Sequence, residues 1–109
     1  MPGYRIYYRK DPTFREDKDL TKEGVLRSGK FVYITTVRFP EDEKRNPLDV
    51  VFMNFQAEFM NWANKAHTMR AGNHMSMSVG DVLADADTGK MWQCGDPVGW
   101  VPVPARRKK

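Results

Sequence analysis

The chain has 109 residues, a length that predicts a single domain with a core of its own. It contains 18 basic and 14 acidic residues, which gives a formal net charge of +4. No segment approaches the run of about 20 apolar residues that a membrane span requires. The single cysteine, Cys94, excludes an internal disulfide and a metal site made of four cysteines. The first residues lack the apolar core of a signal peptide, so we expect a soluble cytoplasmic protein.

The excess positive charge lies at the end of the chain, in Arg106, Arg107, Lys108 and Lys109. Without these four residues the basic and acidic side chains are equal in number. The rest of the chain is therefore not the basic body that duplex-DNA-binding proteins usually show. We predict one domain over residues 1–104 and a disordered basic tail over residues 105–109, which either keeps the protein soluble or contacts phosphates.

The first predicted strand covers residues 4–9, where side chains alternate between two faces. One face carries Tyr4, Ile6 and Tyr8, and the other carries Arg5, Tyr7 and Arg9. The second face is either an ordinary solvent face, with Tyr7 covering apolar surface, or a basic-aromatic surface that stacks a base and pairs with phosphate.

Residues 10–30 form a long polar excursion that is either functional or poorly ordered. A short helical turn is expected at residues 20–26, and Phe14, Leu20, Val25 and Leu26 are candidate tethers to the core. Residues 31–39 are β-branched and aromatic almost throughout, which predicts a central strand with both faces at least partly covered.

Residues 47–62 have the periodicity of a helix. Their apolar stripe consists of Leu48, Val51, Phe52, Phe55, Phe59 and Trp62. Asn46 followed by Pro47 predicts the start of this helix. We expect most of the stripe to be buried against a sheet; the alternative is a partner-binding helix with an exposed Phe/Met flank.

Three further strands are predicted after the helix. Residues 75–84 form a strand with a kink at Gly80-Asp81, and residues 85–89 form a hairpin turn. Residues 91–94 and 98–103 complete the sheet, and Pro102 places the last strand at an edge. The predicted fold is α+β: a small, mainly antiparallel sheet of four to five strands, with one main helix packed on one face.

The sequence shows no recognisable catalytic or cofactor motif. His67, His74 and Cys94 lack the spacing of a metal site, although a Cys-His pair can form in space. The acidic residues at 85–96 only superficially resemble a calcium loop. We predict no enzyme activity, no metal and no cofactor.

Two tryptophans near the end of the chain are candidate binding residues. Trp92 and Trp100, together with Tyr7, would form an exposed aromatic platform, or they would anchor the core. Met69, Met75 and Met77 likewise would either fill the core or form an adaptable binding surface.

One stretch resembles a known family. The sequence HMSMSVGDV at residues 74–82, followed by GKMW at residues 89–92 and VGW at residues 98–100, resembles the C-terminal part of the YodL-like family. These are small domains of unknown function found in phages and mobile elements. The resemblance covers the last third of the chain and implies an accessory protein of a phage or prophage. Ser76 and Ser78 would cap backbone groups before the strand.

The leading hypothesis is a small non-enzymatic accessory protein of a phage or mobile element that binds a host protein in the host cytoplasm and modulates defence or metabolism. The alternative is a nucleic-acid-binding module that uses the basic-aromatic strand and the basic tail. The binding candidates are Arg5, Tyr7, Arg9, Trp92, Trp100, Arg106, Arg107, Lys108 and Lys109. We expect a monomer or a homodimer, because an edge strand can pair with a second copy.

Overall fold

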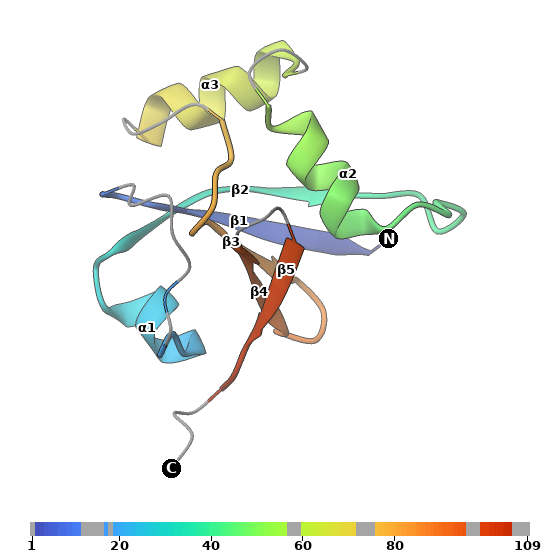
Figure 1. The fold of residues 1–109 in the computed structure, drawn as a ribbon. Coiled ribbons are helices and arrows are strands. Elements are labelled where there is room, and N and C mark those ends of the chain that lie inside the picture. The colour runs from blue at the N-terminus through green and yellow to red at the C-terminus, as the bar shows by residue number, and fades with distance from the viewer. Residues whose placement is uncertain are drawn as a thin grey trace.

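A computed structural model describes residues 2–11, 17, 19–56, 60–71, 76–95 and 99–105. The elements in chain order are β1 (Gly3–Arg9), α1 (Lys22–Arg27), β2 (Phe31–Arg38), α2 (Pro47–Asn54), α3 (Trp62–Ala71), β3 (Val82–Asp85), β4 (Met91–Gly95) and β5 (Gly99–Val103). The five strands form one antiparallel sheet in the order β2-β1-β3-β4-β5 (Figure 1). This confirms the α+β fold, with three helices in the described part of the chain.

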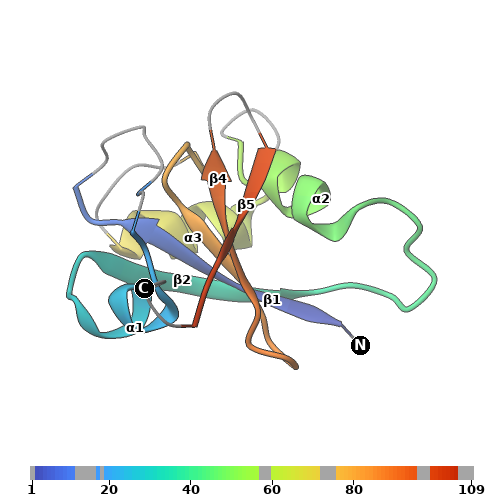
Figure 2. The ribbon, with the colours of Figure 1, turned by 60° about the horizontal axis from the view of Figure 1, so that its bottom comes forward.

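The sheet is covered on both faces. Helices α2 and α3 lie on one side of β1 and β2, and α1 lies on the other (Figures 1 and 2). The larger core, on the α2 side, consists of Tyr4, Ile6, Tyr8, Ile34, Phe39, Leu48, Val50, Val51, Phe55, Met60, Met77 and Leu83. The smaller core, on the α1 side, consists of Tyr7, Val25, Phe31, Val82, Ala84, Met91 and Val103. The expectation of a single covering helix is therefore too simple.

Strand β2 is an edge strand, which corrects the prediction of a central strand. It pairs only with β1, and the register shifts at Ile6/Tyr7 in β1. Strand β1 lies inside the sheet, where it pairs with β2 and β3, and β3 is the central strand. Most of β2 is buried or half-buried, as the expectation of partly covered faces requires, but Tyr33 is 51% exposed and Arg38 is also exposed.

The helix predicted over residues 47–62 ends at Asn54, and a separate helix, α3, begins at Trp62. Asn46 caps α2 as expected, because its side-chain oxygen accepts a hydrogen bond from the Leu48 N–H at 3.0 Å. At the other end, Gln56 donates its amide both to the Phe52 carbonyl at 3.1 Å and to the Met77 carbonyl at 3.0 Å. The Phe55 carbonyl accepts from the Met77 N–H at 3.0 Å. These bonds tie the end of α2 to the chain before β3.

The break in the helix moves the end of the predicted stripe into solvent. Phe55 is fully buried and Phe52 is partly buried, as expected, but Trp62 is 88% exposed. Phe59 lies outside the described residues.

The predicted kink at Gly80-Asp81 is a turn that precedes the strand. The strand predicted to start at residue 75 begins only at Val82, and Gly80 has a φ of +102°. The next turn is the expected hairpin, in which the Asp85 carboxylate accepts from the Asp87 and Thr88 N–H groups at 2.8 and 3.1 Å. Strand β5 lies at the predicted edge.

Within residues 10–30, the predicted helical turn is α1. Val25 is buried and Leu20 packs beside it, whereas Leu26 is 57% exposed and is not a tether. Phe14 lies outside the described residues. None of the described helices is long and apolar enough to cross a membrane.

Candidate functional surfaces

Helix α3 packs with its polar side toward the sheet. Thr68 is only 2% exposed, and Asn64 and His67 are half-buried. The Thr68 hydroxyl donates to the Lys65 carbonyl at 3.0 Å, which satisfies it without a partner from the sheet. By contrast, Trp62 is 88% exposed and Met69 is 67% exposed. The polarity of this helix is therefore the reverse of that of an ordinary surface helix.

The exposed apolar side chains of α3 share one stripe. A hollow of about 440 Å³ is lined by Trp62, Lys65, Ala66 and Met69, which are spaced at i, i+3, i+4 and i+7. Burying a side chain as large as methionine contributes about 1.5–3 kcal/mol. Trp62 and Met69 are exposed, so neither side chain makes this contribution to the stability of the fold. Contiguous exposed apolar surface marks interaction sites.

A second surface lies on the α1 side of β1 and β2. Cross-strand pairing places Arg5 opposite Thr36 and Tyr7 opposite Tyr33. The Tyr33 ring meets the Tyr7 ring edge-on, with 5.8 Å between centroids, and its hydroxyl lies 2.6 Å from the Thr36 hydroxyl. Tyr33 is thus an exposed ring held in a fixed orientation.

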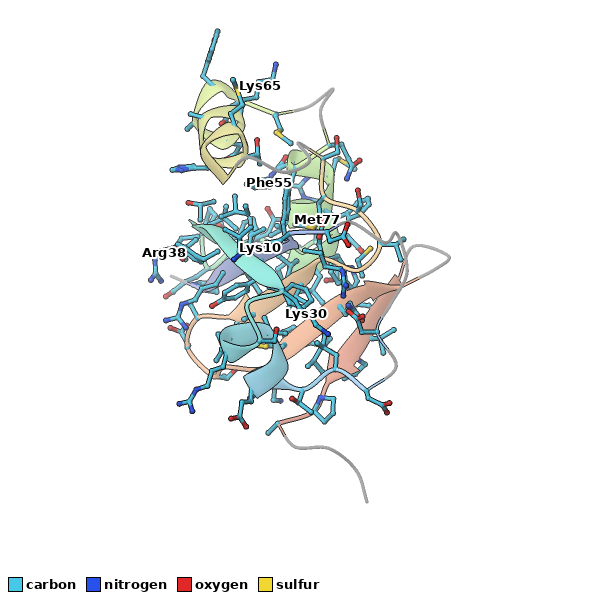
Figure 3. The ribbon with its side chains drawn as sticks, turned by 90° about the vertical axis from the view of Figure 1, so that its left-hand side faces the viewer. Lys10, Lys30, Arg38, Phe55, Lys65 and Met77 are labelled. Atoms are coloured by element: carbon cyan, nitrogen blue, oxygen red, sulfur yellow. The ribbon has the colours of Figure 1, made fainter. Side chains whose placement is uncertain are left out.

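Two arginines share this face of the sheet with the Tyr33 ring. Arg5 is exposed on β1, and Arg38 projects at the edge of the molecule (Figure 3). A Cβ atom at Gly3 would lie 3.1 Å from the Arg38 side chain, so the glycine leaves room for this arginine to lie along the strand. Sequence reasoning missed Tyr33 and Arg38, because residues 31–39 were expected to form a central strand rather than an edge strand.

The predicted basic-aromatic face of β1 does not form one open surface. Arg5 is exposed, but Tyr7 is only 9% exposed. Burial raises the pKa of Tyr7, and the nearby Arg5 opposes that rise. Arg9 forms an ion pair with Asp17, and its guanidinium carbon lies 5.4 Å from the centre of the Phe31 ring. Arg9 is therefore engaged within the fold.

The two candidate tryptophans lie on the α2 side of the sheet. Trp92 packs on Tyr4 with 6.3 Å between ring centroids. Trp100 meets Phe52 edge-on at 6.2 Å, and its indole N–H donates to the Asp49 carboxylate at 3.1 Å. Because Tyr7 belongs to the core of the opposite face, the predicted platform of these three rings does not form. Residues 106–109 lie outside the described residues.

A polar network closes one end of the sheet. The buried Asp81 carboxylate accepts from the Arg9 N–H at 2.9 Å and from the Ser78 N–H at 2.8 Å. Ser78 also donates its hydroxyl to the Ser76 carbonyl at 3.1 Å. A cavity of about 300 Å³ lies nearby, with Arg9 among its lining residues. These contacts join the end of β1 to the turn before β3, which is a structural role.

The described residues show neither a reactive cysteine nor a metal centre. Cys94 is fully buried, and burial together with the charge of Asp81 raises its pKa to about 11. A thiol in that state is a poor nucleophile at neutral pH. No group of three or more histidine, cysteine, aspartate or glutamate side chains in the described part of the chain is arranged to hold a metal ion. His67 lies on α3, and His74 is outside the described residues.

Comparisons with protein-family models, with curated proteins and with solved structures found no match. The resemblance to the YodL-like family therefore stays a prediction. Function is inferred from the surfaces of this chain.

Proposed function

We propose that this protein is a non-enzymatic binding module that docks another protein on the outer face of α3. The observation that supports the proposal most strongly is the 88% exposure of Trp62 beside the exposed Met69, on a helix that turns its polar side inward. Tryptophan is enriched among the residues that dominate binding energy at protein interfaces, and methionine adapts its shape to a partner.

The resemblance at residues 74–82 adds a biological setting to this proposal. In that setting, the chain is an accessory protein of a phage or mobile element, and the partner is a host protein in the host cytoplasm. Binding would then modulate host defence or metabolism. This setting depends on the resemblance and is separable from the docking face itself.

An affinity pull-down from host lysate, treated with nuclease and washed at low and high salt, tests the docking face. The wild type is compared with the double variant W62A/M69A and with L26A, which removes an exposed apolar side chain on the opposite side of the sheet. We expect a partner that survives high salt with the wild type and L26A and is lost with W62A/M69A. Equal recovery with all three proteins would contradict the proposal.

A second candidate function is the binding of single-stranded nucleic acid on the α1 side of β1 and β2. It is favoured by the exposed Tyr33 ring, which lies on the same sheet face as Arg5 and Arg38. Stacking of a base on an aromatic ring contributes about 1–3 kcal/mol. Fluorescence anisotropy with a labelled oligouridine would show weaker binding for Y33A, retained binding for Y33F and a steep loss with added salt. The absence of salt-sensitive binding would remove this candidate.

A further inference from the structure

The outer face of α3 carries positive charge without any acidic neighbour on the helix. Lys65 lies in the outer stripe of α3, and residues 60–71 contain no aspartate or glutamate. Asn61 caps the helix by accepting from the Asn64 N–H at 2.8 Å, so the positive end of the helix dipole lies beside Trp62. The electrostatic potential of this face therefore favours a negatively charged partner.

Lys65 is the cation placed within the apolar stripe itself. It lines the same hollow as Trp62 and Met69, and its side chain is half-buried on α3, far from the core residues Phe55 and Met77 (Figure 3). Within the described part of the chain, no salt bridge or side-chain hydrogen bond engages the Lys65 ammonium. A partner that covered the stripe without supplying a carboxylate would bury this charge unpaired, which is costly.

A second copy of this chain does not fit the same face. Two α3 helices packed through their outer faces would bring Lys65 of one copy toward Lys65 of the other. Neither helix contributes an acidic residue that would neutralise them. Like charges placed together across an interface oppose association, so charge argues against a homodimer formed through α3.

We propose, on the basis of the function proposed above, that the partner presents a short amphipathic segment that combines an apolar side chain with an aspartate or glutamate about one helical turn away. The apolar side chain fills the hollow between Trp62 and Met69, over Ala66. The carboxylate pairs with Lys65. This arrangement buries the apolar stripe of α3 and leaves no unpaired charge in the interface.

Two synthetic amphipathic peptides test the proposal. Both have the same leucine face and no tryptophan, and they differ only in whether glutamate or lysine flanks that face. Binding is followed by isothermal titration calorimetry at low and high salt. The protein variants are K65E and K30E, which change the net charge equally; Lys30 is exposed and lies outside α3.

For the wild type we expect the glutamate peptide to bind about fivefold or more tightly than the lysine peptide, since reversing a partly buried pair turns attraction into repulsion. The K65E variant should reverse this preference, and K30E should retain it. If K65E and K30E changed the peptide preference equally, the preference would come from the net charge of the protein, and the proposal would be overturned. Failure of both peptides to bind would also overturn it.

The pull-down with W62A/M69A separates this proposal from the one on which it rests. If the peptides fail but the partner is lost with W62A/M69A, the docking face stands and the acidic segment is wrong. If the partner is retained as well, both are wrong. If light scattering shows that the wild type is a dimer and that W62A is a monomer, a second copy of the chain is the occupant instead.

Discussion

Gln93 holds Asp17 at two points. The Gln93 side-chain oxygen accepts from the Asp17 N–H at 2.7 Å, and its amide nitrogen donates to the Asp17 carboxylate at 2.8 Å. The same amide also donates to the Gly80 carbonyl at 2.9 Å, and Gln93 is only 2% exposed. A single buried side chain on β4 thus fastens the segment before α1 and the turn before β3.

Replacing Gln93 with leucine should loosen Asp17, because both of its contacts to Gln93 are lost while the ion pair with Arg9 is kept. We expect a loss of about 1–3 kcal/mol in the free energy of unfolding, from the polar groups left unpaired. Urea denaturation measures that loss, and limited proteolysis should show faster cleavage in residues 10–19. Stability and cleavage unchanged from the wild type would contradict this role.

The Q93E variant adds a test of charge at the same position. It places a carboxylate against the Asp17 carboxylate and the Gly80 carbonyl, so the charged form is disfavoured and the pKa of the new glutamate should be raised. A raised folded-state pKa means that stability is greater at low pH and is lost as the pH rises. The free energy of unfolding of Q93E, compared with that of Q93L, should therefore be higher at acid pH than at pH 8. A difference between the two variants that does not change with pH would contradict a raised pKa of the new glutamate.

Substitutions at Asp81 should lower the stability of the fold, because its two carboxylate oxygens accept hydrogen bonds from two different backbone N–H groups. The D81A variant leaves the Arg9 and Ser78 N–H groups without this acceptor and should lose about 3 kcal/mol of stability. The D81N variant keeps one acceptor oxygen and should lose less. Thermal or urea unfolding of the two variants measures this order, and D81N being as damaging as D81A would show that the charge rather than the bonds matters.

The local patterns of the sequence predicted much of this fold. Alternation located β1, the Asn46-Pro47 pair located the start of α2, and the turn residues at 85–89 located the hairpin. Each of these patterns depends on only a few neighbouring residues. The local structure that it predicts therefore does not require knowledge of tertiary contacts.

The errors arose where contacts between distant residues decide the outcome. The end of α2 depends on bonds from Gln56 and Phe55 to Met77, which periodicity alone does not reveal. The edge position of β2 depends on strand order. The candidate docking face followed from the helix break, because Trp62 leaves the apolar stripe once α2 ends at Asn54.

Cys94 should be nearly unreactive in the folded protein. Burial raises its pKa to about 11, above the ordinary value of a thiol, so at pH 8.5 the folded protein holds about a hundredfold less thiolate than the unfolded chain. Alkylation by iodoacetamide should be slow in buffer and fast in urea. Equal rates in the two conditions would show that the thiol is accessible in the folded protein.

The same shift predicts a sensitivity to alkaline pH. The folded protein binds the thiol proton more tightly than the unfolded chain, so the contribution of Cys94 to stability is complete below pH 9 and is lost as the pH rises toward about 11. Burial likewise raises the pKa of Tyr8, which acts in the same direction. A C94A variant should show a shallower fall in stability over this range than the wild type, and an identical fall would assign the effect to other groups.

Substitutions at Phe55 and at Trp62 should differ in their effect on stability. Both were expected in one buried stripe, but Phe55 is fully buried and Trp62 is 88% exposed. The F55A variant should lose about 3–5 kcal/mol because it leaves a cavity in the core. The W62S variant should unfold within about 0.5 kcal/mol of the wild type, since an exposed side chain contributes little to the folded state. Urea unfolding measures both, and a loss above about 1 kcal/mol in W62S would show that Trp62 packs within the chain and is not available to a partner.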